Sequence, residues 1–589
     1  MGGFVTEKTL SFPIGVDDYK EIIDKKCIYI DKTLLIKEFW KDDAKVILVT
    51  RPRRFGKTIS LSMLRYFFES REESNAYLFE KSKIWQEEGF SEIQGRFPVI
   101  FISFKDIKYN TWEKSYAKIK NIIKSEVVRT LSPLLGKCLP EEKIQYDELI
   151  NFSQIADENR ILINFISSLK FITQVYERIY KKKTIVLIDE YDTPITCAYE
   201  NHFYGDMIEF MRNLLSESLK DNPHMQKGFM TGVVRTAKDG IVSGLNNPKI
   251  CTMLDSGFAD KFGFTEEEVH HLLLLTNRFD QKSNVKKWYN GYVAGTKCLS
   301  DPDTSHLAYH VYNPWSILSY LAGPAKRPET YWANTGNRNL LERLISEASE
   351  ETQNELKLLM EGKSLKNKII DEDVILLDLD EKGHEPWSFL FFAGYVTASG
   401  YTYKNKYFYK LKTPNKEIEE LYKKLVLSAI NKKFSFLQLS KLHESLVNGD
   451  VSRFSDLLTL FVQNFCSSHD LHQSDLERSL HLFVLGLLAA LSETYLIDSN
   501  LETGKGRCDI MLCPHPSASD GISGIIIEFK KGAKENLEVL AEEALTQIKK
   551  LDYHSRFRKC HFKGPVLCYG IASYKKELFV KMELLHIVS

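Results

Sequence analysis

A basic, glycine-containing loop holds the first residues that could do chemistry. Residues 51–58 are RPRRFGKT, and they lie between a short apolar run, KVILVT, and a segment with helical spacing, ISLSMLRYFF. Backbone N–H groups and the helix dipole at such a strand–loop–helix junction can hold phosphates. Lys57 would reach the β- and γ-phosphates and the Thr58 hydroxyl would bind Mg²⁺, with Arg54 and Gly56 as further nucleotide-binding residues. The alternative is a basic loop that only caps a helix.

Two carboxylates at the end of a later apolar run complete this candidate nucleotide site. The segment TIVLIDE ends in Asp189 and Glu190; we expect Asp189 to hold the metal ion and Glu190 to act as general base toward water. Thr231, in the strand-like run GFMTGVV, is a candidate sensor of the γ-phosphate, and Arg235 could neutralise transition-state charge. A solvated loop start and a capped strand end are the structural alternatives. The two motifs together predict a site for ATP and Mg²⁺.

A second set of chemical groups lies near the C-terminus. Glu528 and Lys530 are two apart in the apolar run GIIIEFK, so on a strand their side chains share one face, and Asp509 on a neighbouring strand can converge with them. Phosphodiester hydrolysis uses carboxylates that hold Mg²⁺ and a lysine beside the attacking water. Glu477, at the start of a preceding predicted helix, is a further candidate metal ligand, and Gln547 could orient the phosphate. The alternative is a salt-bridged strand end.

The elements that position these groups can be predicted from hydrophobic patterning. The runs PVIFISF, TIVLID and GFMTGVV are near-continuous apolar strands, as in a parallel sheet that is buried on both faces. Helical stretches such as TWEKSYAKIKNIIKSEVVRTL alternate with them, which predicts a doubly wound α/β domain over residues 1–255.

The rest of the chain is expected to form three further parts. Residues 256–425, called the lid region below, are expected to be all-helical or winged-helical, and residues 426–475 a helical connector. Residues 476–589 predict a small α/β domain with the order helix, strand, strand, helix, strand, in which the first helix covers 476–497. Aromatic side chains of the lid region, such as Trp315 and Trp332, are expected to be buried in packing more often than to stack bases.

Composition limits the classes of protein. The chain has 589 residues with 43% hydrophobic and 27% charged residues, as in soluble multidomain proteins. Lys+Arg and Asp+Glu are both 79, so a site for a polyanion must be a local patch. The ten cysteines include no CxxC pair, which argues against a zinc ribbon and favours a reducing, cytoplasmic setting. We expect no transmembrane segment and no signal peptide, although Met1, Gly2 and Thr6 fit a loose N-myristoylation pattern.

Several motifs together carry a resemblance to a known family. FPIGVDDY, YIDKT, VTRPRRFGKT, VLIDEYDTPI, KWYNGY, VYNPWSIL and YWANT resemble the AAA-ATPase-like proteins that are usually followed by a PD-(D/E)XK nuclease-like domain. The similarity runs from about residue 8 to the C-terminus, and RPRRFGKT is the family's own form of the P-loop, including Arg51 where the general pattern has glycine. The resemblance implies a P-loop NTPase fold akin to AAA+ and STAND switches. The spaced D…ExK pattern with its GxGRxDI lead-in resembles the restriction-endonuclease-like fold.

The sequence therefore predicts a cytoplasmic, ATP-regulated, Mg²⁺-dependent nuclease that acts on DNA or RNA. The alternative is an ATP-switched interaction or nucleic-acid-binding protein whose nuclease fold is inactive, including a host-directed effector. Homo-oligomerisation and binding of a protein partner stay open.

Overall fold

The chain forms two compact units. The computed structural model describes all residues except 1–9, 221, 236–247, 297, 299–307, 324–326, 333–351, 353–354, 357, 360–361, 373–385, 423, 425–435, 466–483, 485–486, 489–490, 492–493, 504–505, 516–520, 551–556, 558–561, 563, 575 and 587–589. The first unit comprises residues 1–344 and 361–419, and the second comprises residues 345–360 and 420–589.

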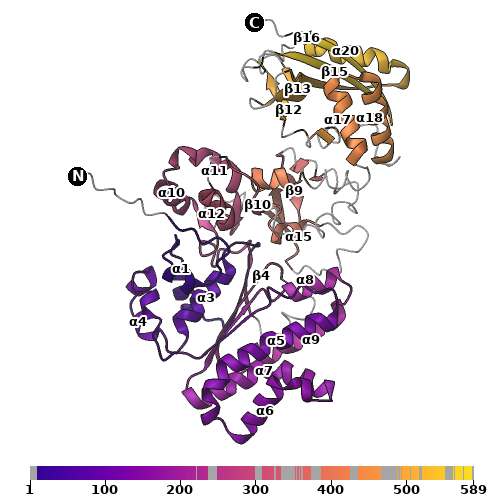
Figure 1. Cartoon of the computed structure of the whole chain (residues 1–589). Helices are drawn as coiled ribbons and strands as arrows, with labels where there is room; N and C mark the ends of the chain where they lie inside the picture. Colours follow the sequence, from indigo (N-terminus) through magenta and orange to yellow (C-terminus); the bar gives the residue numbers. More distant parts are fainter. Residues whose placement is uncertain are drawn as a thin grey trace, which may run out of the picture. The chain divides into compact units, whose positions relative to one another are not determined.

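A five-stranded parallel sheet forms the centre of the first unit (Figure 1). Its strand order is β2-β3-β4-β1-β5, so β4 lies between β1 and β3. The strands are β1 (Val46–Thr50), β2 (Val99–Ser103), β3 (Thr184–Asp189), β4 (Met225–Gly232) and β5 (Lys249–Cys251). The first four coincide with the runs predicted as strands. Because parallel strands end at the same edge, the residues that follow β1, β3 and β4 are brought together there.

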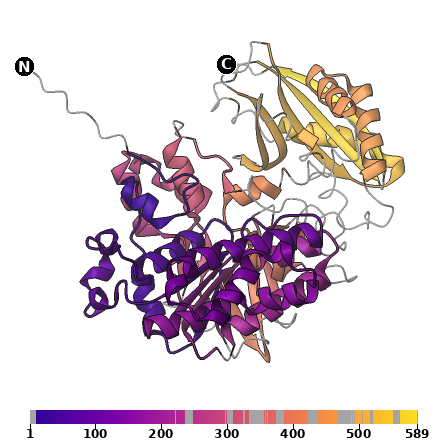
Figure 2. The ribbon, with the colours of Figure 1, turned by 60° about the horizontal axis from the view of Figure 1, so that its bottom comes forward.

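Helices cover both faces of this sheet, and Figure 2 shows them lying over it. Every residue of β1 and β3 is buried, as the continuous apolar runs predict. One face packs a cluster of aromatic and aliphatic side chains that includes Phe39, Phe67 and Phe229. The helices of this domain are α1 (Tyr19–Asp24), α2 (Leu34–Lys41), α3 (Lys57–Phe68), α4 (Phe90–Ile93), α5 (Trp112–Leu131), α6 (Pro140–Ile150), α7 (Glu158–Tyr180), α8 (Thr193–Glu200) and α9 (Tyr204–Leu219).

The lid region combines helices with two small antiparallel sheets. One has the strand order β6-β8-β7 and the other the order β10-β11-β9, so an all-helical lid region is not what forms. Tyrosine-rich segments such as YHVY and KYFYKLK pair as strands here, which helical spacing did not predict. The elements are β6 (Phe264–Thr265), α10 (Glu266–Leu275), α11 (Lys282–Tyr289), β7 (Tyr292–Ala294), β8 (Tyr309–Tyr312), α12 (Pro314–Ala322), β9 (Leu365–Lys368), α15 (Trp387–Phe392), β10 (Thr397–Lys404) and β11 (Lys406–Lys412).

The second unit is built on a five-stranded mixed sheet with the order β12-β13-β14-β15-β16. Its elements are α17 (Phe436–Asn448), α18 (Val451–Phe465), β12 (Tyr495–Thr503), β13 (Gly506–Pro514), β14 (Gly524–Lys531), α20 (Leu537–Lys550), β15 (Pro565–Tyr574) and β16 (Glu577–His586). The strands β13, β14 and β15 and the helix α20 were predicted. Two expectations were wrong: the helix predicted to reach residue 497 gives way to β12 at Tyr495, and β16 was not foreseen.

Candidate functional sites

The loop between β1 and α3 has the backbone of a phosphate cradle. Arg54 and Gly56 both adopt the left-handed conformation, with φ of +66° and +85°, and Gly56 is the N-cap of α3. Consecutive turns of this kind point backbone N–H groups into a shared concavity that suits an anion. The sequence places glycine at the position with the larger φ, where a side chain would be strained.

Arg51 has a structural role away from this cradle. Its side chain is 1% exposed, and its Nη1 donates hydrogen bonds to the carbonyls of Thr50, Cys251 and Thr252 at 2.8–2.9 Å. Nη2 donates to the Gly257 carbonyl at 3.1 Å. Burial lowers the pKa of the guanidinium to about 10. Arg51 therefore ties the end of β1 to the end of β5, and its guanidinium is used in these structural hydrogen bonds.

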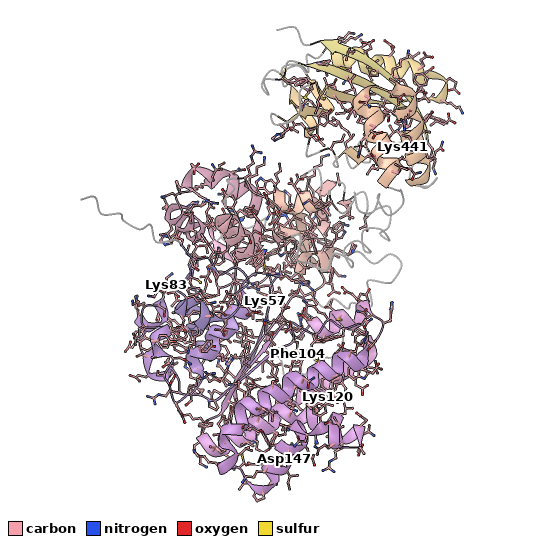
Figure 3. The ribbon with its side chains drawn as sticks, viewed as in Figure 1. Lys57, Lys83, Phe104, Lys120, Asp147 and Lys441 are labelled. Carbon is pink, nitrogen blue, oxygen red and sulfur yellow. The ribbon has the colours of Figure 1, made fainter. Side chains whose placement is uncertain are left out.

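Lys57 and Glu190 form a buried ion pair beside the loop. Lys57 Nζ lies 3.1 Å from Glu190 Oε1, and it also donates to the carbonyls of Arg51 and Pro52 at 3.1 and 3.2 Å. Figure 3 shows Lys57 beside the strand ends of the parallel sheet. Burial alone would raise the pKa of Glu190, but the Lys57 ammonium and its hydrogen bond lower it below its ordinary value. Glu190 also has a left-handed φ of +53°, which is strained for this residue type.

Asp189 is the centre of a hydrogen-bond cluster at the end of β3. Its Oδ2 accepts from the Thr58 hydroxyl at 2.8 Å and the Ser103 hydroxyl at 3.0 Å, while Oδ1 accepts from the Thr231 hydroxyl at 2.7 Å. The carboxyl is fully buried, and burial followed by the charge of Glu190 raises its pKa. The predicted residues Thr58, Asp189 and Thr231 thus meet at one point. Ser103, which ends the edge strand β2, belongs to the same cluster and was not predicted.

Asp192 is a further acidic group of this site that sequence analysis missed. Its Oδ2 accepts from the backbone N–H groups of Val233 and Val234 at 2.8 and 2.9 Å, whereas its buried Oδ1 has no hydrogen-bond partner in the described part of the chain. Burial, with a contribution from Glu190, raises its pKa to about 6. The side chain lies so close to Gly232 that a Cβ there would approach Oδ1 to 2.8 Å, which explains the second glycine of GFMTGVV. The second aspartate of the motif DEYD was the available signal.

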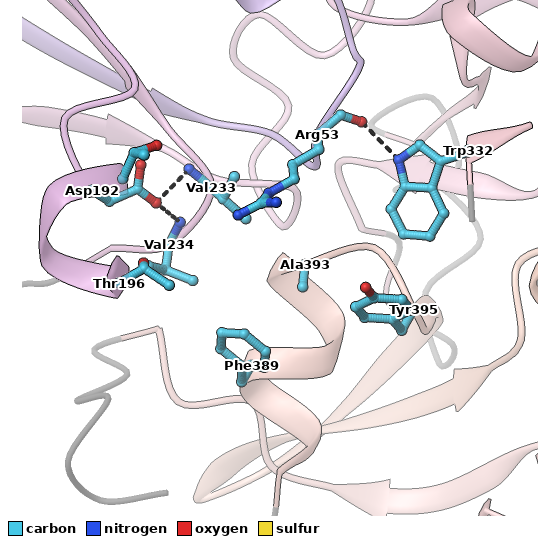
Figure 4. Close-up of a pocket in the computed structure, with 10 residues that line it drawn as sticks. Arg53, Asp192, Thr196, Val233, Val234, Trp332, Phe389, Ala393 and Tyr395 are labelled. Atoms are coloured by element: carbon cyan, nitrogen blue, oxygen red, sulfur yellow. Dashed lines mark hydrogen bonds between the residues drawn. The ribbon is translucent and has the colours of Figure 1, made fainter. Parts of the chain in front are cut away.

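Side chains of the lid region contact the loop between β1 and α3, which is called the phosphate loop below after its predicted role. The Arg53 carbonyl accepts hydrogen bonds from Trp332 Nε1 at 3.0 Å (Figure 4) and from Asn313 Nδ2 at 3.2 Å. The Arg54 guanidinium lies 4.1 Å from the ring centroid of Trp315. Trp332 is 2% exposed, so the prediction that it is buried is confirmed. Residues of the aromatic motifs of the lid region therefore contact the loop that carries Lys57 and help to fix its conformation.

A small cavity lies between the loop, α8 and the lid region. It encloses about 30 Å³, and its lining includes Arg53, Asp192, Trp332, Phe389 and Tyr395 (Figure 4). A volume of this size holds one or two water molecules and no base or sugar. The cavity therefore has room for a water molecule beside the Asp192 carboxyl.

The predicted Arg235 lies three residues beyond the end of β4, on the segment that follows Thr231 and Gly232. Its role toward phosphate stays a prediction.

The second candidate site lies on the α20 face of the C-terminal sheet. Ile526, Glu528 and Lys530 alternate along β14 with Ile525, Ile527 and Phe529, which pack on the opposite face. The Asp509 backbone N–H lies 3.4 Å from Glu528 Oε2, and Asp509 Oδ2 accepts from the Phe529 backbone N–H at 2.8 Å. The predicted convergence of Asp509, Glu528 and Lys530 is therefore present in the geometry.

Gln547 joins these groups from α20. Its Oε1 accepts from Lys530 Nζ at 2.5 Å, and its Nε2 donates to Glu528 Oε1. This reach depends on the close packing of α20 on β15, where a Cβ at Gly570 would collide with the Ala541 carbonyl. Glu528 is 2% exposed, so the amide bridge stabilises a buried carboxylate.

The remaining predicted ligand, Glu477, lies outside the described residues, as does Gly2. Within the described part of the chain, no cluster of three or more His, Cys, Asp and Glu residues has the geometry of a metal site. The pair of Asp509 and Glu528 supplies carboxylate oxygens, the donor type that hard cations such as Mg²⁺ prefer.

Comparison with known proteins matches both domains to family models. Residues 13–242 match the family model described as a predicted AAA-ATPase, and residues 475–583 match that of the PD-(D/E)XK nuclease superfamily. The chain thus carries a AAA-ATPase-like domain followed by a PD-(D/E)XK nuclease superfamily domain. Over 556 residues it is 24% identical to the "Uncharacterized protein in vnfD 5'region" of Azotobacter chroococcum mcd 1, and the match covers 93% of each chain. The similarity therefore extends across both domains and the region between them.

Among the helices that the structure describes, none combines the length and the hydropathy that a bilayer crossing requires.

Proposed function

We propose that the first unit binds and hydrolyses ATP with Mg²⁺. The observation that supports this most directly is the meeting of Lys57, Thr58, Asp189, Glu190 and Thr231 at one edge of the parallel sheet. The hydroxyl and carboxylate oxygens of Thr58 and Asp189 are suitable donors for Mg²⁺. When bound, the ion would neutralise charge on the β- and γ-phosphates.

The ion pair between Lys57 and Glu190 implies that phosphate binding by Lys57 comes before proton transfer to Glu190. Lys57 must leave the Glu190 carboxylate and the loop carbonyls to reach phosphate oxygens. The ion pair keeps Glu190 ionised until then. Departure of Lys57 removes the charge that lowers its pKa, so the carboxylate becomes a stronger base toward water. Phosphate binding would therefore free the general base only when it is needed.

Two substitutions test this proposal. Lys57→Ala removes the ammonium group and is expected to weaken ATP binding in a calorimetric titration. Glu190→Gln is expected to retain binding and to slow ATP hydrolysis by about 100-fold or more. Equal ATP affinity of wild type and Lys57→Ala would contradict the assignment of the loop.

We further propose that the second unit cleaves phosphodiester bonds of DNA or RNA with Mg²⁺. Asp509 and Glu528 would hold the ion, which would act as a Lewis acid, and Lys530 would orient the attacking water. Gln547 holds Lys530 and Glu528 in register in the absence of substrate. A phosphate that binds the Lys530 ammonium would do so beside the Gln547 amide.

A metal titration of cleavage tests the nuclease centre. Asp509→Asn is expected to raise the Mg²⁺ concentration needed for activity, whereas Lys530→Ala is expected to slow cleavage at every Mg²⁺ concentration. The double variant should cleave only a little more slowly than the slower of the two single variants, because the effects of substitutions within one catalytic centre do not add. Absence of cleavage by wild type on single- and double-stranded DNA and RNA would favour the alternative, a nucleic-acid-binding domain with an inactive nuclease fold.

Finally, we propose that nucleotide state controls the second unit through Trp332 and Glu417. Trp332 contacts the phosphate loop through its indole N–H, and its backbone N–H donates to Glu417 Oε1 at 2.6 Å. Glu417 is 1% exposed, accepts also from the Ser316 hydroxyl at 2.8 Å, and lies two residues before the first unit ends at Glu419. A change in the loop thus has a continuous hydrogen-bonded route to the segment that enters the second unit.

A further inference from the structure

The hairpin of β10 and β11 presents an aromatic ladder. Its chain reverses at Asn405, which has a left-handed φ of +63°. Tyr401 pairs directly with Tyr409, and Tyr403 pairs with Tyr407, so the four rings share one face of the hairpin. Neighbouring rings lie 5.1–6.1 Å apart between centroids.

The two ends of this ladder differ in exposure. Tyr409, at the base, is 7% exposed and packs within the first unit, whereas Tyr403 and Tyr407 at the tip are 62% and 52% exposed. The tip rings are 5.1 Å apart and inclined at 55°. A pair of β-branched residues would serve the hairpin at the tip without exposing two aromatic rings. Packing within the first unit therefore explains the tyrosines at the base and leaves those at the tip unexplained.

Lysines occupy the positions that alternate with the tyrosines, so their side chains leave the opposite face of the hairpin. Residues 397–412 contain Lys404, Lys406, Lys410 and Lys412 and no acidic residue. Lys404 and Lys406 are exposed and stand directly opposite each other across the turn, an arrangement of like charges that destabilises a hairpin. None of these four lysines forms an ion pair with a carboxylate in the part of the chain that the structure describes. A bound polyanion would relieve this repulsion.

We propose that this hairpin binds single-stranded nucleic acid. Bases stack on Tyr403 and Tyr407, and Lys404 and Lys406 contact the adjacent phosphates. Exposed aromatic rings and nearby cations are the two elements of sequence-tolerant single-strand binding, because every base has a face that can stack. Lys404 and Lys406 start on the opposite face from the rings, and at the hairpin tip their long side chains can turn toward a strand that stacks on Tyr403 and Tyr407. A duplex keeps its base faces covered and would gain only the charge contacts. This site lies in the first unit and does not depend on the nuclease centre.

Binding without cleavage provides the test. The full chain is titrated, in buffer with a chelator and no divalent metal, into fluorescently labelled oligothymidylate, oligouridylate and a DNA duplex. Tyr403→Thr/Tyr407→Thr keeps β-propensity but removes both rings, and it is expected to raise the Kd for either single strand by about tenfold or more. Tyr403→Phe/Tyr407→Phe keeps the rings and is expected to bind as wild type.

The lysines require a separate readout. Lys404→Gln/Lys406→Gln is expected to reduce the slope of log Kd against log salt by about 0.7 for each phosphate that is no longer neutralised. Lys41→Gln/Lys287→Gln, at two exposed helical lysines of the same unit, removes equal charge and is the matched control. Unchanged affinity of the Tyr403→Thr/Tyr407→Thr variant, or tighter binding of the duplex than of both single strands, would overturn the proposal. A change in cleavage rate with unchanged Kd would concern the nuclease centre and would equally count against the hairpin.

Discussion

At the scale of residues, Asp192 is a buried carboxyl whose ionisation is unfavourable in the folded protein. Its carboxyl is 2% exposed and stands near Glu190, and only one of its two oxygens accepts hydrogen bonds from protein groups in the described part of the chain. Burial makes ionisation costly, so its pKa rises from 3.8 to about 6. Such perturbed carboxyls are common at functional sites.

This shift predicts the pH dependence of stability in the first unit. Folded Asp192 holds its proton up to about pH 6, while the unfolded chain releases it near pH 4, so stability decreases as pH rises through this window. Asp192→Asn removes this dependence and keeps an oxygen for the Val233 and Val234 N–H groups. We expect the variant to gain about 1–3 kcal/mol relative to wild type between pH 4 and pH 6.5, by urea unfolding. Parallel pH profiles of the two proteins would show that the pKa is not raised.

Arg51 marks the limit of sequence reasoning at this scale. Lys57, Thr58 and Asp189 were predicted to form one site because a strand–loop–helix junction with GKT is followed by an apolar strand that ends in two carboxylates, and Thr231 was a candidate for the same site. The destination of the Arg51 side chain could not be predicted, since it depends on carbonyls about 200 residues later in the chain. The sequence motif locates the loop along the chain. The direction of each of its side chains depends on tertiary contacts, which the motif does not contain.

At the scale of elements, strands buried on both faces were the most predictable part of the fold. A short continuous apolar run is typical of a strand in a parallel sheet, and β1 to β4 formed where such runs predicted strands. β16 has the sequence ELFVKMELLH, whose composition suits a helix as well as a strand. Its full-length antiparallel pairing with β15, the strand just before it, decides the outcome, and the composition of the segment alone does not reveal this pairing.

The contact of α20 with β15 leads to a prediction about the second unit. Gly570→Ala would place a Cβ against the Ala541 carbonyl, so α20 must shift and move Gln547 from Glu528 and Lys530. We expect a decrease of about 1–3 kcal/mol in unfolding free energy, typical of overpacking, together with slower cleavage.

The matched control is Val539→Ala, at a position on the same helix that is 58% exposed. It should leave both the unfolding free energy and the cleavage rate near those of wild type. Wild-type stability of Gly570→Ala in chemical denaturation would mean that the helix is free to move without cost.

At the scale of the whole molecule, the two domains share one chain, and sequence alone offers only that association as a reason for coupling. The structure adds a physical element. The phosphate loop must rearrange when Lys57 leaves Glu190, and the lid region already holds the Arg53 carbonyl through two donors. Coupling requires an element whose equilibrium both sites bias, and this loop with Trp332 is the candidate that the contacts define.

Trp332→Phe tests that coupling. The substitution keeps an aromatic ring against Tyr395 but removes the N–H that reaches the Arg53 carbonyl. We expect ATP binding to persist, while the ratio of nucleic-acid cleavage rates with an ATP analogue and with ADP falls toward one. Energetic coupling between sites is typically about 5- to 150-fold, so the change is measurable. If cleavage is absent, the same ratio is taken from Kd values for an oligonucleotide.

Trp387→Phe is the matched control. Trp387 is as deeply buried in the same lid region, but its indole N–H has no hydrogen-bond partner among the described residues, so its removal should leave the ratio unchanged. A fall of the ratio in both variants would trace the effect to packing of the lid region. A full wild-type ratio in Trp332→Phe would contradict the route through Arg53 and Glu417. Only a fall in Trp332→Phe together with retention in Trp387→Phe identifies the hydrogen bond to the phosphate loop as the link between nucleotide and nuclease domain.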